Sequence, residues 1–448
     1  MKNAAENGNH YLEKISCRDL RRGMYVQELD RPWLETPFMF QGFRIRNEEE
    51  IETLQKYCEY VFVNRVMEEI DPWIIHRGAA RNETDSRNNT SRKASEEIDS
   101  SVRHLKVESE QSMASLVRAL ANKTGGGSSY TSTVSVEKEL ETASKIYEES
   151  KSAIEDVFCD ADSNGAININ HASNTTSSIV DSVLRNPDAL MLLQRIKRNA
   201  HYRYTHAINC CALAATFCLH LGFSKSEIQD ISMGGLLLDI GFTKLPGSLL
   251  NTQSALNPLM LKVVRHHVNY GMEILNNTSD LPPIVREMIM THHERINGNG
   301  YPNAMKGEQI PVCGRIAAIL DCYDAMISNR PHKKGMSPIA AICAMYNWRN
   351  IDFHEDLVEQ FIQCIGAYPT GTLVELNSGQ VGIVISQNRL RRLYPKILLI
   401  LSVDGKRYEY PHTVDLWEYS QETRGQELEI KRSVDADDLG IDLSDYYL

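Results

Sequence analysis

Two adjacent histidines and a glutamate stand directly before a glycine-rich turn, in the sequence HHERINGNGYP at residues 292–302. Neighbouring residues on an α-helix point about 100° apart. His292 and His293 can therefore face one metal ion only from a distorted helix end, or if the ion is reached from two sides. The turn from Asn297 to Pro302 favours a helix end. The motif thus predicts a helix that stops at a metal site.

The surrounding segment predicts helices that carry further metal ligands. Between residues 176 and 366, apolar residues such as Ile179 and Val183 recur every three or four positions, which is the period of an α-helix. Histidine and carboxylate ligands together suit iron, manganese or zinc better than calcium or magnesium. The candidate ligands on separate predicted helices are His206, Asp239, His266 or His267, His292, His293 and Asp321.

A ligand set of this size points to phosphoester chemistry. Two metal ions about 3.5–4 Å apart can clamp both oxygens of an in-line displacement at phosphorus. One carboxylate has to bridge the two ions, and Asp239 is the natural candidate. By contrast, a single histidine on an apolar helix face is commonly a hydrogen-bonded core residue. We interpret His201, His220 and His266 in that way.

Composition narrows the class of protein. The net charge of −11 argues against binding to a nucleic-acid polymer, which requires a basic face, but it leaves room for a small phosphate ligand. The apolar stretch at 207–223 contains Asn209 and His220, so it predicts a buried core helix and no membrane span. The ten cysteines show no CxxC pattern. They are typical of free thiols in the cytoplasm.

The chain divides by composition and periodicity into segments of different character. Period-two patterns flank Asn377-Ser378-Gly379 and Asp404-Gly405, which predicts two β-hairpins. The expected organisation is an α+β module at 11–75, a flexible low-complexity linker at 76–133, a coupling helix and turn at 134–175, a helical domain at 176–366, an antiparallel β module at 367–418 and an acidic tail at 419–448.

The helix expected at 136–158 allows two interpretations. Its apolar residues Leu140, Ile146 and Ile154 are interspersed with many charges. It can be a coupling or dimer helix, which would make the protein a homodimer. It can equally be an amphipathic helix on the surface of the helical domain. The sequence leaves both interpretations open.

Residues 176–418 resemble the HD-GYP family. The resemblance rests on HHE followed by NGNGYP (292–302), KGEQIP (306–311), RIAAILDCYDAMISNRP (315–331) and HVNYGMEIL (267–275). Characterised members of this family hydrolyse the second messenger cyclic di-GMP by metal-activated water. Residues 11–75 resemble an N-terminal domain of unassigned function that often precedes it. The resemblance implies a mainly α-helical protein built around an HD-type bundle.

The resemblance also assigns roles to residues. It implies metal ligands at His206, Asp239, His267, His292, His293 and Asp321, with Asp239 and Asp321 in catalysis. It selects His267 over His266 because of the spacing to Gly271 and Leu275. Residues that contact substrate phosphate fall on Arg330 and Lys333. Gly300, Tyr301 and Pro302 form the loop that shapes the pocket and, in some members, docks diguanylate cyclase domains.

The chain departs from the family pattern around its bridging aspartate. The histidine of the HD pair is Leu238, and the lysine expected three residues after the aspartate is Phe242. Lys244 is displaced by two positions. Tyr202 stands where members with a third metal carry an acid. The resemblance therefore implies one strong metal site and one weakened site, loaded with divalent iron or manganese.

Two functions from different classes follow. The first is a cyclic di-GMP phosphodiesterase whose activity is impaired because Leu238 cannot bind metal. The second is a non-catalytic signalling protein that binds cyclic di-GMP or docks a partner domain, which Leu238 and Phe242 favour. The retained histidine pair and Arg330 indicate a working pocket in either case.

Overall fold

The structure is a computed structural model of the chain. It describes residues 12–22, 24–31, 43–45, 48–64, 132–197, 202–250, 257–330, 334–389, 391, 393–423 and 428–446. The chain divides into two compact units, Met1–Gln111 and Ser112–Leu448. The linker expected at 76–133 lies outside the described residues except at its C-terminal end, and so do His201 and Lys333.

The first unit is a small α+β module. Its sheet has the order β1-β4-β2-β3, and α1 begins with three glutamates, which the helix dipole favours. Ile51 and Leu54 face the core, which they share with Val26, Val61 and Val63. The elements are β1 (Leu12–Ser16), η1 (Cys17–Asp19), β2 (Tyr25–Leu29), β3 (Phe43–Arg44), α1 (Glu48–Tyr57) and β4 (Tyr60–Asn64).

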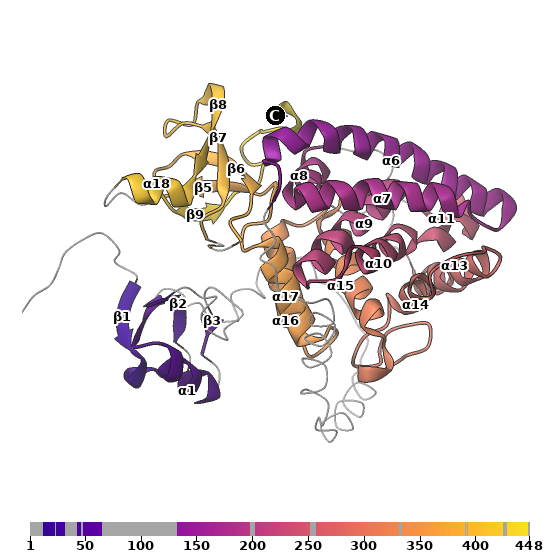
Figure 1. The fold of residues 1–448 in the computed structure, drawn as a ribbon, viewed down its shortest axis with the longest axis horizontal. Coiled ribbons are helices and arrows are strands. Elements are labelled where there is room, and N and C mark those ends of the chain that lie inside the picture. The colour runs from indigo at the N-terminus through magenta and orange to yellow at the C-terminus, as the bar shows by residue number, and fades with distance from the viewer. Residues whose placement is uncertain are drawn as a thin grey trace, which may run out of the picture. The chain divides into compact units, whose positions relative to one another are not determined.

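The second unit is a helical bundle followed by a β module (Figure 1). The expected mainly helical class is therefore confirmed. The helical elements are α6 (Val136–Asn164), α7 (Ile169–Arg185), α8 (Pro187–Ile196), α9 (Tyr202–His220), α10 (Lys225–Leu237), η4 (Ile240–Lys244), α11 (Gly247–Leu250), α12 (Pro258–Arg265), α13 (His267–Asn276), α14 (Pro283–Thr291), η5 (Gly307–Gln309), α15 (Val312–Ile327), α16 (Pro338–Trp348) and α17 (Glu355–Ile365).

Local sequence signals set where these helices begin. Asn186 accepts a hydrogen bond from the backbone nitrogen of Asp188 at 2.9 Å, and Pro187 occupies the first turn of α8. Ser224 and Glu227 form a reciprocal capping box at the start of α10. The capped helix α10 ends at Leu237, directly before Leu238 and Asp239.

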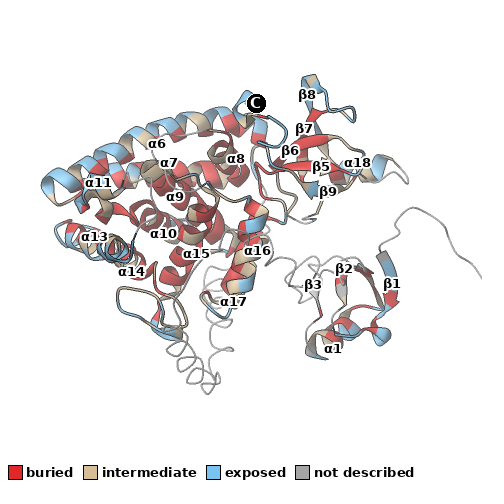
Figure 2. Ribbon diagram, turned by 180° about the vertical axis from the view of Figure 1, so that it is seen from behind, coloured by how far each residue is buried: buried red, intermediate tan, exposed pale blue. Residues whose placement is uncertain are grey.

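Helix α9 lies at the centre of the bundle and is buried on most sides from His206 to Cys218 (Figure 2). The apolar stretch at 207–223, most of which lies in α9, is thus a core helix, as expected. His220 at its end makes a hydrogen bond with Gln360 at 2.9 Å, in keeping with a packing role. None of the helices in the described ranges combines the length and apolar character that crossing a bilayer requires.

Helix α6 belongs to the bundle, which settles one open interpretation. Its apolar face, including Leu140, Tyr147 and Ile154, is buried in the same core as α9 and α10. Its buried Glu139 forms an ion pair of 2.7 Å with Arg185 of α7. The domain boundary expected at residue 176 is therefore too late. A homodimer would have to use a surface other than this apolar face.

The β module forms one antiparallel sheet of order β8-β7-β6-β5-β9. One face joins the bundle core through residues such as Ile383 and Leu398, and the other packs on α18 through Val384 and Leu399. Both expected hairpins are confirmed. The elements are β5 (Leu373–Leu376), β6 (Val381–Ser386), β7 (Lys396–Leu401), β8 (Arg407–Asp415), α18 (Leu416–Glu422), β9 (Ile430–Ser433) and η6 (Leu443–Tyr446).

The expectation of an acidic tail outside the folded module is wrong. Strand β9 pairs with β5, and further on Ile441 and Tyr446 are buried against the bundle. The sequence does not predict this strand because its exposed side chains are charged, which hides the alternation of apolar and polar residues. Lys431 and Arg432 both form ion pairs with Glu375 of β5.

Candidate metal centre

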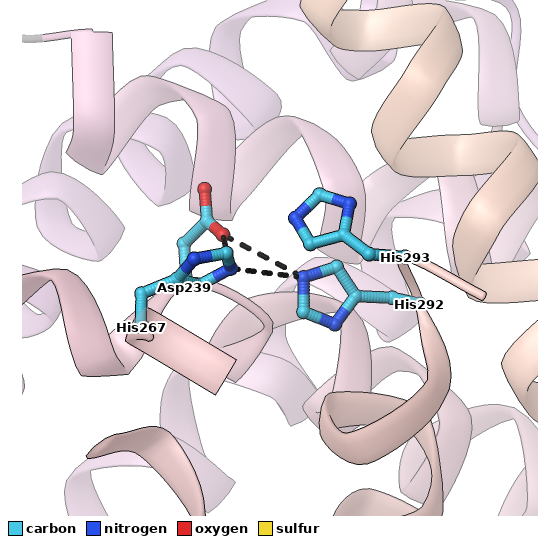
Figure 3. Close-up of side chains that lie close together, drawn as sticks. All are labelled: Asp239, His267, His292 and His293. Carbon is cyan, nitrogen blue, oxygen red and sulfur yellow. Dashed lines mark hydrogen bonds and ion pairs between the residues drawn. The ribbon is translucent and has the colours of Figure 1, made fainter. Parts of the chain in front are cut away.

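The six candidate ligands come from five segments that meet inside the bundle. His206 lies on α9, Asp239 lies between α10 and η4, and His267 is the first residue of α13. His292 and His293 directly follow α14, as the helix-end interpretation predicts, and Asp321 lies on α15. Figure 3 shows Asp239, His267, His292 and His293 gathered with their side chains directed at one another.

The first cluster is built around one oxygen of Asp239. Its Oδ1 atom lies 3.5 Å from Nε2 of His267 and 3.8 Å from Nε2 of His292. The Nδ1 atoms of these two histidines each lie 2.8 Å from a backbone carbonyl oxygen, of Val264 and Ile289 respectively. Hydrogen bonds from Nδ1–H to these carbonyls leave the Nε2 lone pairs free for a metal ion.

The second cluster uses the other oxygen of Asp239. Nε2 of His206 lies 3.5 Å from Oδ2 of Asp239 and 3.2 Å from Oδ1 of Asp321. Leu238, which is 1% exposed, supplies only hydrocarbon at the place of the family histidine. Asp239 therefore faces both clusters, but the second has fewer protein ligands than the first.

The sequence interpretation missed Asp324, which orients His206. Asp324 is buried and lies 2.7 Å from Nδ1 of His206. It also accepts hydrogen bonds from Asn209 at 2.8 Å and from Ser328 at 3.2 Å. A carboxylate behind a ligating histidine fixes the ring and raises its basicity. The available signal was spacing, because residues three apart on a helix share a face and Asp324 follows Asp321 by three.

The donor set fits a divalent cation. Oδ1 of Asp239 is buried and has no hydrogen-bond donor among the described residues. A buried carboxylate oxygen without a partner is costly, and imidazole nitrogens surround this one. A cation between Asp239, His267 and His292 would satisfy all three groups.

Burial sets the protonation of the cluster in the metal-free protein. It lowers the pKa of His267, His292 and His293, so these imidazoles are neutral and able to bind metal at pH 7. Burial also raises the pKa of Asp239, and the nearby Asp321 adds to that effect. The pKa of Asp321 is lowered despite its burial, chiefly because a hydrogen bond with His206 stabilises its charge.

A close backbone contact holds the Asp239 turn against α13. A Cβ atom added to Gly241 would lie 1.9 Å from the carbonyl oxygen of His267 and 2.4 Å from the nitrogen of Gly271. Only glycine fits at this distance. Gly241 therefore allows η4 to bring Asp239 within reach of His267.

The loop containing Gly300, Tyr301 and Pro302 is anchored beside the histidines. Buried Glu294 accepts hydrogen bonds from the backbone nitrogens of Asn303 at 2.7 Å and Met305 at 2.9 Å. The Tyr301 ring stacks on His293 with centroids 4.5 Å apart. This stacking makes the loop one wall of the site.

The departures from the family pattern have defined places. Phe242 stacks on His267, with ring centroids 4.3 Å apart and planes 8° apart. Lys244 donates a hydrogen bond to the carbonyl oxygen of Asp162 at 2.7 Å, so it points to the end of α6 and does not replace the missing lysine. Tyr202 stacks on His206, and the guanidinium of Arg330 lies 4.9 Å from the Tyr202 ring centre.

Comparison with known proteins identifies the family. Residues 186–353 match the HD domain family, and residues 12–172 match a domain of unknown function (DUF3391). A cyclic di-GMP phosphodiesterase of Pseudomonas aeruginosa is 31% identical over 414 residues, which are 92% of this chain and 91% of that protein. The chain belongs to the HD-GYP family.

Other relatives match over shorter stretches of the chain. The 3'3'-cGAMP-specific phosphodiesterase 2 of Vibrio cholerae is 37% identical over 128 residues, 28% of this chain and 24% of that protein. The cyclic di-GMP phosphodiesterase response regulator of Xanthomonas campestris is 33% identical over 144 residues, 32% of this chain and 38% of that protein. Both relatives are therefore similar to this chain over only a minor part of their own length.

Proposed function

We propose that this HD-GYP protein is a metal-dependent phosphodiesterase that hydrolyses cyclic di-GMP with impaired activity. The observation that carries the proposal is the placement of Asp239 between a complete histidine cluster and a second cluster that lacks one ligand. Divalent iron or manganese bound there would activate water and neutralise phosphate charge. The names of relatives from Pseudomonas aeruginosa and Xanthomonas campestris support cyclic di-GMP as the substrate.

The protein's own residues would hold the metals in two unequal positions. Asp239, His267, His292 and His293 would form the strong position, and His206, Asp239 and Asp321 the weakened one. The histidines are neutral ligands, so the bound cations keep more of their positive charge than an all-carboxylate set would leave. That residual charge favours an anionic phosphodiester.

The substrate would be held by cationic and aromatic groups beside the metals. The Nε atom of Arg330 is buried and has no acceptor among the described residues, so its guanidinium can donate to a phosphate oxygen. We propose the same role for Lys333. Gly300, Tyr301 and Pro302 would form the wall against which the substrate lies.

Impairment follows from the chemistry of Leu238 and Phe242. Without a metal ligand at residue 238, the second position binds its cation less tightly. At residue 242, the aromatic ring of Phe242 stands in place of a cationic side chain. Removing one well-placed electrostatic donor from an active site commonly costs roughly 10²–10³ in rate. We therefore expect slow hydrolysis.

The same two residues favour a second candidate function. In this alternative the protein binds cyclic di-GMP without turnover, or docks diguanylate cyclase domains through the loop at 300–302. Both functions would operate in the cytoplasm. The described cysteines are all free thiols, which fits a reducing compartment.

Restoring the family residues separates the two functions. Metal content and cyclic di-GMP hydrolysis would be measured for the wild type and for Leu238→His with Phe242→Lys. Leu238→Gln with Phe242→Lys is the matched control, because it adds polarity without an imidazole. We expect about one tightly bound metal in the wild type, about two in the histidine variant, and a rise in rate of roughly 100-fold.

Three outcomes are informative. Two tightly bound metals and fast hydrolysis in the wild type would contradict the impaired site. Binding of cyclic di-GMP without hydrolysis in every variant would favour the non-catalytic function. Equal gains in the histidine and glutamine variants would show that the imidazole is not the missing group.

A further inference from the structure

A cavity of about 780 Å³ is lined by Tyr202 and Asp324, which both contact His206, and by Arg330, which is also proposed to bind the substrate. Residues of α8, α9 and the C-terminal end of α15 line it, together with residues 370–373 at the start of β5 and residues 433–437 at the end of β9. None of the six proposed metal ligands lines it. Helix α8 also contacts β6 of the β module (Figure 1). The size of the cavity is that of a small-molecule site.

Arg195 of α8 contributes a buried positive charge to this cavity. Among the described residues its guanidinium makes one hydrogen bond, from Nη1 to the carbonyl oxygen of Ile327 at 3.3 Å, and its Nε atom has no acceptor. Burial lowers the pKa of this guanidinium, and the charges of Tyr323, Asp324 and Asp435 offset that effect only in part. A buried cation that no carboxylate pairs with directly is unfavourable. The arrangement becomes favourable when an anion occupies the cavity.

Two further lining residues offer hydrogen-bond donors without partners. Nε2 of Gln194 and Oγ1 of Thr372 are buried, and neither has a partner among the described residues. Buried polar groups are normally satisfied, so a cluster of unpaired donors around one cavity indicates an acceptor-rich ligand. Tyr202 and Tyr323 add aromatic surface to the lining, against which a planar base can pack.

We propose that this cavity is a second ligand site, which binds a phosphate monoester through the guanidinium of Arg195. A phosphate monoester carries up to two negative charges and three terminal oxygens, and arginine binds such groups with paired hydrogen bonds. A nucleoside monophosphate matches both the cavity volume and its aromatic lining. Free phosphate shares the anionic group but not the planar base.

The position of the site links it to the metal centre, a step that rests on the proposed function. Tyr202 and Asp324 line the cavity, and both also contact His206. His206 is a proposed ligand of the weakened metal position. Occupation of the cavity therefore acts on the groups that orient this ligand. By linkage, metal binding and phosphate monoester binding change each other's affinity by the same factor.

Calorimetric titration of the full chain, stripped of metal with a chelator, tests the site. The probes are guanosine monophosphate, inorganic phosphate and guanosine. We expect both phosphates to bind and guanosine to bind far more weakly. Tighter binding of guanosine monophosphate than of inorganic phosphate identifies a nucleotide ligand, and equal binding identifies free phosphate. Guanosine binding as tight as that of its monophosphate would overturn the proposal.

Two arginine variants locate the binding. Arg195→Met should weaken guanosine monophosphate roughly 10- to 100-fold, the usual effect of losing a charged hydrogen bond. Arg407→Gln, which removes an exposed guanidinium from β8, should leave the affinity unchanged. If Arg195→Met fails to fold, Gln194→Leu takes its place and should weaken binding several-fold. Wild-type affinity in the folded variant would exclude this cavity.

A metal-centre variant separates this inference from the proposed function. Metal-stripped Asp239→Asn should bind guanosine monophosphate like the wild type, while its hydrolysis of cyclic di-GMP is lost. Binding that disappears in Asp239→Asn but persists in Arg195→Met would overturn the second site. Absence of hydrolysis in the wild type would contradict the proposed enzyme without affecting the titration. Metal affinity unchanged by guanosine monophosphate would refute the link through His206.

Discussion

At the scale of single residues, the two metal positions differ in the groups that hydrogen-bond to their histidine ligands. Backbone carbonyls orient His267 and His292, whereas a buried carboxylate orients His206. The weakened position thus depends on His206 and its partner more than the strong position depends on any one histidine. Residues outside the ligand set should therefore control it.

Replacing Asp324 by asparagine tests this dependence. Asp324→Asn removes the charge that holds His206, and loss of such a partner typically weakens metal binding 10- to 100-fold. We expect a loss of this size at the weaker position, measured by competition with a chelating dye. Ser328→Ala is the control, because it removes a hydrogen bond of 3.2 Å but keeps the carboxylate. Equal metal affinities in Asp324→Asn and the wild type would refute the role.

His292 should make the metal-free protein sensitive to acid. Burial lowers its pKa in the folded state, while an unfolded histidine titrates near 6.5. The unfolded chain therefore binds the extra proton first, so this residue's contribution to stability is lost as pH falls below about 6.5. His292→Gln should lose less stability than the wild type between pH 7 and 5.

Denaturant unfolding at each pH, with a chelator present, measures this difference. His412→Gln provides the comparison, because His412 is an exposed histidine on β8. It should follow the wild type across the same range. Parallel pH profiles for the wild type and His292→Gln would count against the assignment.

The candidate ligands could be recognised from the sequence, but their supports could not. The histidine pair at 292–293 and the turn after it predict a helix end. Asp239 is recognised because it follows Leu238, which replaces the histidine of the HD pair. The contact of Asp324 with His206 depends on how α9 and α15 are rotated against each other. The stacking of Phe242 on His267 likewise depends on tertiary packing. Neither relation has a local signature.

At the scale of elements, the loop after α14 is fixed by a side chain within the motif itself. Glu294 accepts from two backbone nitrogens of the loop, and Tyr301 stacks on His293. The loop and the metal ligands are therefore mechanically connected. Loosening the loop should disturb the site without removing any ligand.

Glu294→Gln is the corresponding variant. It keeps the side-chain size but removes the charge and one of the acceptor oxygens, which should cost roughly 1–3 kcal/mol of stability. Hydrogen exchange at the amides of Asn303 and Met305 should become faster. Glu308→Gln, which alters an exposed glutamate outside this anchor, should leave exchange at both amides unchanged. Unaltered protection in Glu294→Gln would mean that other contacts hold the loop.

Helical periodicity identified the bundle but not its limits. Apolar spacing alone cannot say what covers a helix face, so the helix at 136–158 had two interpretations. In the structure, the apolar face of this helix, α6, packs against the other bundle helices. The β hairpins were predicted because their turns carry local sequence signals, whereas β9 pairs with a strand far away in the sequence and has none.

At the scale of the second unit, residues 428–446 pack against both the β module and the bundle. Strand β9 completes the sheet, and Lys334 pairs with Asp435 and Asp437 beside the cavity. Leu428, Ile441 and Tyr446 are each less than 9% exposed. The segment that looks most dispensable in the sequence therefore supports both the sheet and the second cavity.

Deleting residues 424–448 should therefore destabilise the whole unit. Burial of each large apolar side chain contributes about 1.5–3 kcal/mol, so losing three should lower the free energy of unfolding by on the order of 5 kcal/mol. The measurement is denaturant unfolding followed by circular dichroism. Asp435→Asn with Asp437→Asn is the control, because it removes exposed charges and keeps the strand, and it should unfold close to the wild type. If the truncated chain were as stable as the full one, β9 and the segment after it would contribute nothing to the stability of the second unit.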